Sequence, residues 1–203
     1  MTATLHRRAV VKALMKDPTG DLLVIAGLGQ CTWDITDAGD RPQNLPLWGG
    51  MGGAVMVGLG LALAQPQKRV LVITGDGDML MGLGSLATVA AQRPANLAIV
   101  VLDNEKFGET GNQATHTAPA TAGPTERGAG ADLATVARGC GIADSATVTM
   151  ESEVLQLATD ARTKSGPIFR TVKVMIESLS QTMPPKDGAY LKDRFRQAVL
   201  GAV

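Results

Sequence analysis

Short apolar runs alternate with segments of helical length along most of the sequence. The apolar runs predict strands at 22–26, 69–74, 97–103, 146–149 and 168–174. The longer segments predict helices at 3–15, 30–38, 53–64, 83–92, 131–140, 151–163 and 190–200. Strands separated by helices of this size favour βαβ crossovers and a mostly parallel sheet. We therefore expect an α/β fold with a doubly wound sheet and helices on both faces, built as a single domain over 1–203.

Charge and cysteine content restrict the partners and the compartment. The 19 Lys and Arg residues balance the 19 Asp and Glu residues, so net charge gives no reason to expect nucleic acid or an anionic membrane as a partner. The only two cysteines, Cys31 and Cys140, cannot supply a disulfide framework or a zinc or iron–sulfur ligand set. No apolar signal segment opens the sequence, and the apolar run 51–64 is too short to span a bilayer. We expect a soluble, cytoplasmic protein.

A glycine-rich acidic segment follows the predicted strand 69–74. Ligands of open α/β sheets bind beyond the carboxyl ends of the strands, and Gly75-Asp76-Gly77-Asp78 lies at such an end. Glycines at a strand-to-helix turn let backbone amides approach a phosphate. The Asp76 carboxylate would repel that phosphate unless a cation lies between them, and Mg²⁺ binds carboxylate and phosphate oxygens together. The alternative is an ordinary turn without a ligand.

The next strand ends in a second polar segment, Asp103-Asn104-Glu105-Lys106. Adjacent parallel strands place their carboxyl ends side by side, so Asp76 and Asn104 are expected to converge. Asn104 offers a side-chain oxygen and Lys106 offers its backbone carbonyl. The two segments together predict a site for Mg²⁺ and a phosphate-containing ligand.

These two segments resemble the signature of enzymes that depend on thiamine diphosphate (ThDP), in which Gly-Asp-Gly is followed at a similar distance by Asn-Asn. The resemblance implies a ThDP-binding fold, with Mg²⁺ held by the side chains of Asp76 and Asn104 and by the carbonyl of Lys106. Asp103 departs from the signature, but Asp-Asn is typical of the sulfopyruvate and phosphonopyruvate decarboxylase branch. The resemblance also implies that further residues bind the cofactor, namely Gly75, Gly77, Asp78, Phe107 and Gly108.

A methionine flanked by glycines precedes these segments. Gly49-Gly50-Met51-Gly52-Gly53 resembles the Gly-Ser-Met-Gly segment of many ThDP decarboxylases. The resemblance implies that Met51 props the cofactor in a bent shape and that Gly49, Gly50 and the Met51 amide bind its aminopyrimidine. A flexible, polarizable thioether also packs well against an aromatic ring. The alternative is that Met51 fills the core and the glycines allow close packing.

The long polar stretch 104–130 is expected to be functional or mobile, because loops of this length inside a compact domain usually are one or the other. Its first part, 107–117, resembles the Tyr-Gly-x-Thr-Gly-Gly-Gln…His-Thr run of two-subunit sulfopyruvate-type decarboxylases. We expect it to cover the active site, with Gln113 and His116 contacting substrate. The alternative is a solvated loop whose polar residues serve solubility.

The resemblance covers 21–174, and all of it belongs to a diphosphate-binding domain. ThDP enzymes also need a pyrimidine-binding domain that supplies an activating Glu. The resemblance therefore implies an α subunit carrying that Glu, an α₂β₂ assembly or a multiple of it, and a small 2-oxo acid as substrate. In this interpretation the chain is the β subunit of a decarboxylase and is active only with its partner.

Other interpretations remain open at this stage. The chain could be another ThDP subunit, either of a carboligase or of a 2-oxoacid oxidoreductase, although the β chains of the latter carry cluster cysteines. A non-catalytic cofactor-binding subunit is a further alternative. An NAD-binding Rossmann domain fits less well, because its third glycine would fall at Leu80 and Asp76 would face the pyrophosphate without a metal.

Overall fold

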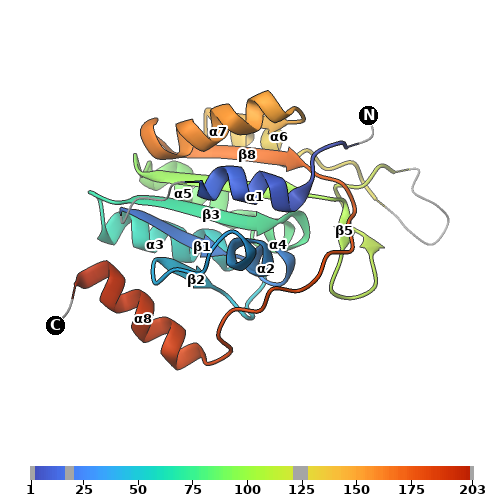
Figure 1. Cartoon of the computed structure of the whole chain (residues 1–203). Helices are drawn as coiled ribbons and strands as arrows, with labels where there is room; N and C mark the ends of the chain where they lie inside the picture. Colours follow the sequence, from blue (N-terminus) through green and yellow to red (C-terminus); the bar gives the residue numbers. More distant parts are fainter. Residues whose placement is uncertain (1–2, 17–20, 121–127, 202–203) are drawn as a thin grey trace.

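The computed structural model describes residues 3–16, 21–120 and 128–201 (Figure 1). Its helices are α1 Arg7–Met15, α2 Gln30–Asp37, α3 Ala54–Ala64, α4 Asp76–Met81, α5 Gly84–Gln92, α6 Leu133–Gly139, α7 Glu151–Thr163 and α8 Gly188–Leu200. Its strands are β1 Leu22–Ala26, β2 Asn44–Pro46, β3 Arg69–Gly75, β4 Leu97–Asp103, β5 Lys106–Phe107, β6 Gln113–Ala114, β7 Asp144–Val148 and β8 Ile168–Lys173.

A six-stranded sheet with the order β2-β1-β3-β4-β8-β7 forms the centre of the fold, and all its neighbouring strands are parallel. The chain adds β2 on one side of β1 and then returns to add β3 on the other side. The winding direction therefore reverses between β1 and β3, which is where open α/β sheets bind ligands. The short β5–β6 hairpin lies beyond the tips of β3 and β8 (Figure 1).

Two apolar cores, one on each face of the sheet, fix the helices. Side chains alternate along β1, so that Leu22 and Val24 belong to one core while Leu23 and Ile25 belong to the other. Helices α1, α2 and α7 pack on the first face, and α3, α5, α6 and α8 pack on the second. The predicted doubly wound sheet with helices on both faces is therefore confirmed.

Several predicted boundaries shift by one or two residues, and the larger differences have local reasons. Helix α1 begins at Arg7 and not at residue 3, because Leu5 extends to form a β-bridge with Val174. Helix α4 begins directly after β3, where the glycines suggested only a turn. Strand β2 lies in the segment 39–46, which the sequence suggested was a polar loop. The hairpin occupies part of the polar stretch 104–130, of which residues 121–127 lie outside the description. Strands of two or three residues carry no periodicity that a sequence pattern can reveal.

Among the described residues, no helix combines the length and the apolar character needed to cross a membrane.

Candidate cofactor site

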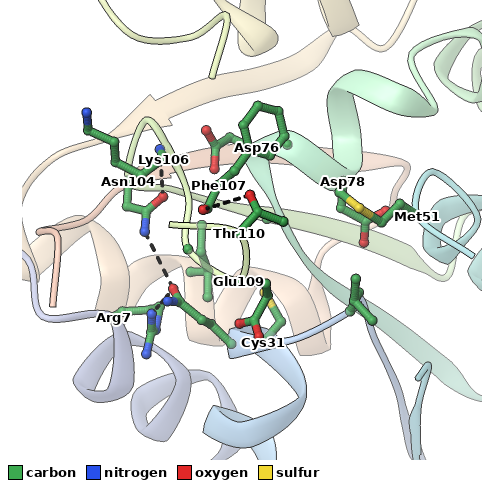
Figure 2. A pocket seen from close by; sticks show the side chains of 16 residues that line it. Arg7, Cys31, Met51, Asp76, Asp78, Asn104, Lys106, Phe107, Glu109 and Thr110 are labelled. Atoms are coloured by element: carbon green, nitrogen blue, oxygen red, sulfur yellow. Dashed lines mark hydrogen bonds between the residues drawn. The ribbon is translucent and has the colours of Figure 1, made fainter. Parts of the chain in front are cut away.

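A cavity of about 120 Å³ lies at the carboxyl edge of the sheet, where the winding direction reverses. It is lined by segments that follow β1, β3 and β4, and by the methionine segment, the hairpin and the start of α1 (Figure 2). The lining residues are Arg7, Leu28, Gln30, Cys31, Met51, Gly75, Asp76, Gly77, Asp78, Leu102, Asn104, Lys106, Phe107, Gly108, Glu109 and Thr110. Lys106 and Asn104 lie at one end and Met51 with Asp78 at the other (Figure 2). We call these the metal end and the methionine end.

Most of the residues predicted to bind the cofactor line this one cavity. The structure brings together Met51, Gly75, Asp76, Gly77, Asp78, Asn104, Lys106, Phe107 and Gly108. Gly49 and Gly50 are exposed beside Met51 and are not part of the lining. The convergence follows from the parallel register of β3 and β4, because Gly75 pairs with Leu102 and the residues after both strands emerge side by side.

The metal end contains two buried carboxylates, Asp76 and Asp103, each 2% exposed. Oδ2 of Asp76 accepts hydrogen bonds from the hydroxyls of Thr115, at 2.5 Å, and Thr117, at 3.0 Å. Thr117 Oγ1 also lies 2.8 Å from Oδ1 of Asp103. A hydroxyl carries a single proton, so the two carboxylates compete for the one that Thr117 donates. Both hydroxyl contacts of Asp76 go to Oδ2, and a bound cation would stabilise this carboxylate further.

The pKa of Asp76 reflects its burial beside a second carboxylate. Burial raises it above the ordinary range of an aspartate, and the neighbouring Asp103 charge raises it further, against the opposing effect of the two threonine hydroxyls. A cation beside Asp76 would offset both causes, because it stabilises the charged form of the carboxylate.

The donors at the metal end are all oxygens, which suits a hard divalent cation. They are the Asp76 carboxylate, the Asn104 amide oxygen and the Lys106 carbonyl, on residues that line the same cavity. Asn104 is 8% exposed, and its Oδ1 accepts from the Lys106 amide at 3.0 Å. Within the described ranges, no group of three His, Cys, Asp or Glu side chains could hold a metal. A cation here would need oxygens from its ligand, as Mg²⁺ takes from a diphosphate.

The two glycines beside Asp76 have different roles. A Cβ at Gly75 would meet no protein atom within 4 Å, so its backbone is open to a ligand. A Cβ at Gly77 would instead overlap the ring of Phe107. Gly75 thus fits the predicted approach of a phosphate, whereas Gly77 is required by the packing of the cavity wall.

Asp78, at the methionine end, binds both the strand that leads to Asp76 and the methionine segment. Its Oδ2 accepts from the hydroxyl of Thr74 at 2.6 Å, and its Oδ1 accepts from the amide of Gly52. The Asp78 carboxylate therefore faces the methionine segment and the body of the sheet. Gly52 has a φ of 86°, in the left-handed region that favours glycine, and follows directly after Met51.

Met51 lines the cavity and is 37% exposed, so the alternative in which it fills the core is wrong. Two further large apolar side chains are exposed close in sequence to Met51 and Asp78. They are Trp48, which is 37% exposed, and Met81, which is 65% exposed. The position of Met51 agrees with contact to a ligand in the cavity.

The lining also includes residues that were not predicted individually from the sequence, among them Arg7, Gln30, Cys31 and Glu109. Arg7 is buried, and its Nε lies 2.5 Å from Oδ2 of Asp34 while its Nη1 donates to Gln30 Oε1. Burial raises the pKa of the Cys31 thiol and of the Glu109 carboxyl above their ordinary values. In the sequence Arg7, Gln30 and Cys31 lie in segments with no chemical motif, so only the packing of α1 against α2 reveals Arg7 and Gln30 as neighbours.

The structure does not bring Gln113 or His116 into the cavity. The Gln113 amide bonds within its own loop to the hydroxyl and the carbonyl of Thr110, each at 2.7 Å. His116 is exposed, and its carbonyl accepts from the amides of Ala129 and Ala131. Contact of Gln113 and His116 with substrate stays a prediction.

Residues 27–172 match the family described as thiamine pyrophosphate enzyme, C-terminal TPP binding domain. The sulfopyruvate decarboxylase subunit beta of Methanocaldococcus jannaschii is 31% identical over 192 residues, which cover 94% of this chain and 95% of that protein. A phosphonopyruvate decarboxylase of Streptomyces viridochromogenes is 34% identical over 95% of this chain, but the match spans only 46% of that protein. A solved thiamin diphosphate-dependent enzyme of Mycobacterium smegmatis, described as putative, has the same fold, with a TM-score of 0.69, 21% identity, and coverage of 86% of this chain and 33% of that one.

Proposed function

The chain belongs to the thiamine pyrophosphate (thiamine diphosphate) enzyme family, and we propose that it is the β subunit of a two-subunit, Mg²⁺-dependent 2-oxo acid decarboxylase. The observation that carries the proposal is the meeting of Asp76, Asn104 and Met51 in one cavity. It is supported by the similarity to a sulfopyruvate decarboxylase subunit beta over nearly the full length of both chains.

In this proposal the metal end holds the cofactor diphosphate. The Asp76 carboxylate, the Asn104 side-chain oxygen and the Lys106 carbonyl bind Mg²⁺, and the open backbone at Gly75 lies against phosphate oxygens. Thr115 and Thr117 hold Asp76 by its Oδ2. When bound, ThDP supplies the electron sink that loss of CO₂ from a 2-oxo acid requires.

The methionine end orients the reactive part of the cofactor. Met51 presents an apolar surface to it, and Asp78 fixes the backbone beside Met51 through the Gly52 amide. We assign the activating Glu to a pyrimidine-binding α subunit, because residues 27–172 match a TPP binding domain described as C-terminal and a relative of nearly equal length is named subunit beta. The exposed side chains of Trp48, Met51 and Met81 offer that subunit an apolar surface.

The names of the relatives support a substrate class. Sulfopyruvate and phosphonopyruvate are both 2-oxo acids with a second acidic group, and both name relatives that match more than 90% of this chain. We propose a 2-oxo acid with a sulfonate, phosphonate or similarly polar tail. Gln113 and His116 on the 107–117 loop are proposed to contact it once the partner and the cofactor are in place.

The test is reconstitution with a pyrimidine-type α subunit. CO₂ release from sulfopyruvate, phosphonopyruvate and simple 2-oxo acids is measured with and without ThDP and Mg²⁺, for each chain alone and for the pair. We expect turnover only by the pair with both cofactors present. Robust activity of this chain alone would contradict the split site. A pair that binds ThDP but decarboxylates none of these acids would favour carboligation or a non-catalytic role.

A further inference from the structure

The residue that departs from the ThDP signature, Asp103, has a partner on the neighbouring strand. Strands β4 and β8 are parallel, and their register places Asp103 directly beside Lys173. Lys173 Nζ lies 2.8 Å from Oδ2 of Asp103 and 2.7 Å from Oε1 of Glu105. On its other oxygen Asp103 accepts from the Glu105 amide at 3.1 Å and lies 2.8 Å from the Thr117 hydroxyl. Both oxygens of this buried carboxylate therefore have donors.

Without Lys173 the same arrangement would be unfavourable. Asp76 and Asp103 both reach the Thr117 hydroxyl, so two buried carboxylates lie side by side with one shared proton between them. A second unpaired negative charge at this point is costly to bury and would repel a diphosphate. An asparagine at position 103 would avoid the problem, but this chain carries an aspartate.

We propose that Lys173 is a positioning residue whose charge compensates buried Asp103, while its other partner, Glu105, is 33% exposed and screened by water, so that Asp103 meets the cofactor site as part of an ion pair and Asp76 remains the carboxylate that binds Mg²⁺. The inference rests on the proposed function, since it requires a metal and a diphosphate at Asp76 and Asn104. It explains why an aspartate is compatible with anion binding at this position.

The proposal predicts opposite changes in two affinities. Loss of the Lys173 charge leaves the Asp103 carboxylate without its ion-pair partner, next to Asp76 with which it shares the Thr117 hydroxyl. A divalent cation by itself then binds more tightly, because it meets two carboxylates. ThDP binds more weakly, because its diphosphate meets an additional negative charge. A lysine that merely supports the local fold would lower both affinities when it is removed.

The experiment is a double-mutant cycle on the assembled α/β enzyme. The variants are wild type, Lys173→Met, Asp103→Asn and the combination of both, with Lys173→Arg as a control that keeps the charge. Calorimetry measures Mg²⁺ binding without ThDP, and ThDP binding at saturating Mg²⁺. Circular dichroism and the oligomeric state establish that each variant is folded and assembled.

We expect Lys173→Met to weaken ThDP binding by about tenfold, a factor that one local charge interaction can supply, and to tighten Mg²⁺ binding severalfold. Asp103→Asn in the same background should return both affinities to near the wild-type values, and Lys173→Arg should stay close to wild type. The cycle is therefore strongly non-additive.

Two results would overturn the inference alone. One is a fall in both affinities in Lys173→Met that Asp103→Asn does not rescue, and the other is an additive cycle in an enzyme whose wild-type form needs Mg²⁺ to bind ThDP. A wild-type pair that binds ThDP equally well without Mg²⁺ would instead refute the proposed metal site, and the role of Lys173 would be refuted with it.

Discussion

The two ends of the cavity differ in how completely this chain builds them. At the metal end, Asp76 and Asn104 are buried, and hydrogen bonds from the chain's own residues fix their side chains. At the methionine end, Met51 is 37% exposed, and the amide of the next residue, Gly52, donates a hydrogen bond to Asp78. The contrast supports the proposal that this chain prepares the diphosphate site by itself and that a second subunit covers the other end.

The difference follows from the fold. Strands β3 and β4 are central in the sheet, so the residues that follow them are covered from several sides. The methionine segment connects β2, an edge strand of three residues, to α3 and includes glycines at positive φ. Changes at the metal end should therefore alter binding of the cofactor, and changes at the methionine end should alter the rate of the bound enzyme.

The largest expected effect is at Asp76. Asp76→Ala in the assembled enzyme should reduce Mg²⁺-dependent ThDP binding by more than the roughly 10–100-fold that is typical when a residue supporting a metal ligand is lost. The reason is the loss of the one carboxylate available to the cation. Calorimetry with ThDP at saturating Mg²⁺ measures the loss, and Asp193→Ala, which removes an exposed carboxylate on α8, serves as the control. Unchanged ThDP affinity in Asp76→Ala would refute the proposal that Asp76 binds Mg²⁺.

A smaller effect at the same end is expected from Thr117. Thr117→Val keeps the shape of the side chain but removes the hydroxyl that Asp76 and Asp103 share. ThDP affinity should fall by roughly 10-fold, the lower part of the range for residues that orient metal ligands. Thr117→Ser, which retains the hydroxyl, should stay near wild type in the same titration. A loss in Thr117→Ser with none in Thr117→Val would show that packing and not the hydrogen bond matters.

A substitution at Met51 tests the role of the methionine end. Met51→Ala should leave ThDP affinity within a few fold of wild type and lower kcat by roughly tenfold or more, because a misplaced reacting group is costly even when binding persists. Steady-state kinetics and a ThDP titration on the same reconstituted pair separate the two quantities. Met51→Leu, which keeps most of the volume, should recover much of the rate. If Met51→Ala loses binding and keeps kcat, the two ends do not divide these tasks as proposed.

The sequence was most informative where local pattern and topology agree. Strands β1 and β4 have the predicted bounds, since they are continuous apolar runs buried on both faces. The metal end could be predicted because Asp76 and Asn104 each directly follow a strand, and parallel strands bring such positions together.

The residues that were missed depend on contacts between segments that are distant in the sequence. Arg7 lines the cavity only because α1 packs on α2 and its guanidinium reaches Asp34 and Gln30. The pairing of Lys173 with Asp103 requires the register of β8 beside β4, which no spacing in the sequence reveals. For Gln113 and His116 the composition predicted a polar loop but contained no information about which way its side chains face.

The smallest expected effect is that of Gly77→Ala, which tests whether Gly77 serves packing of the cavity wall or contact with the ligand. At Gly77 a methyl group would overlap the Phe107 ring, which forms part of the cavity wall. Overpacking of this kind costs about 1–3 kcal/mol, and the better helix propensity of alanine returns up to about 1 kcal/mol. Gly77→Ala should therefore lower the free energy of unfolding by about 1–2 kcal/mol, as measured by urea denaturation of the purified chain.

The same substitution should change ThDP affinity only a few fold, because the glycine whose backbone is open to the cavity is Gly75. Combining Gly77→Ala with Phe107→Ala removes the ring that the new methyl group would meet, so the double variant should be no less stable than Phe107→Ala alone. A Gly77→Ala chain that keeps full stability but loses ThDP would reverse the assignment, and Gly77 would then be the residue whose backbone the phosphate approaches.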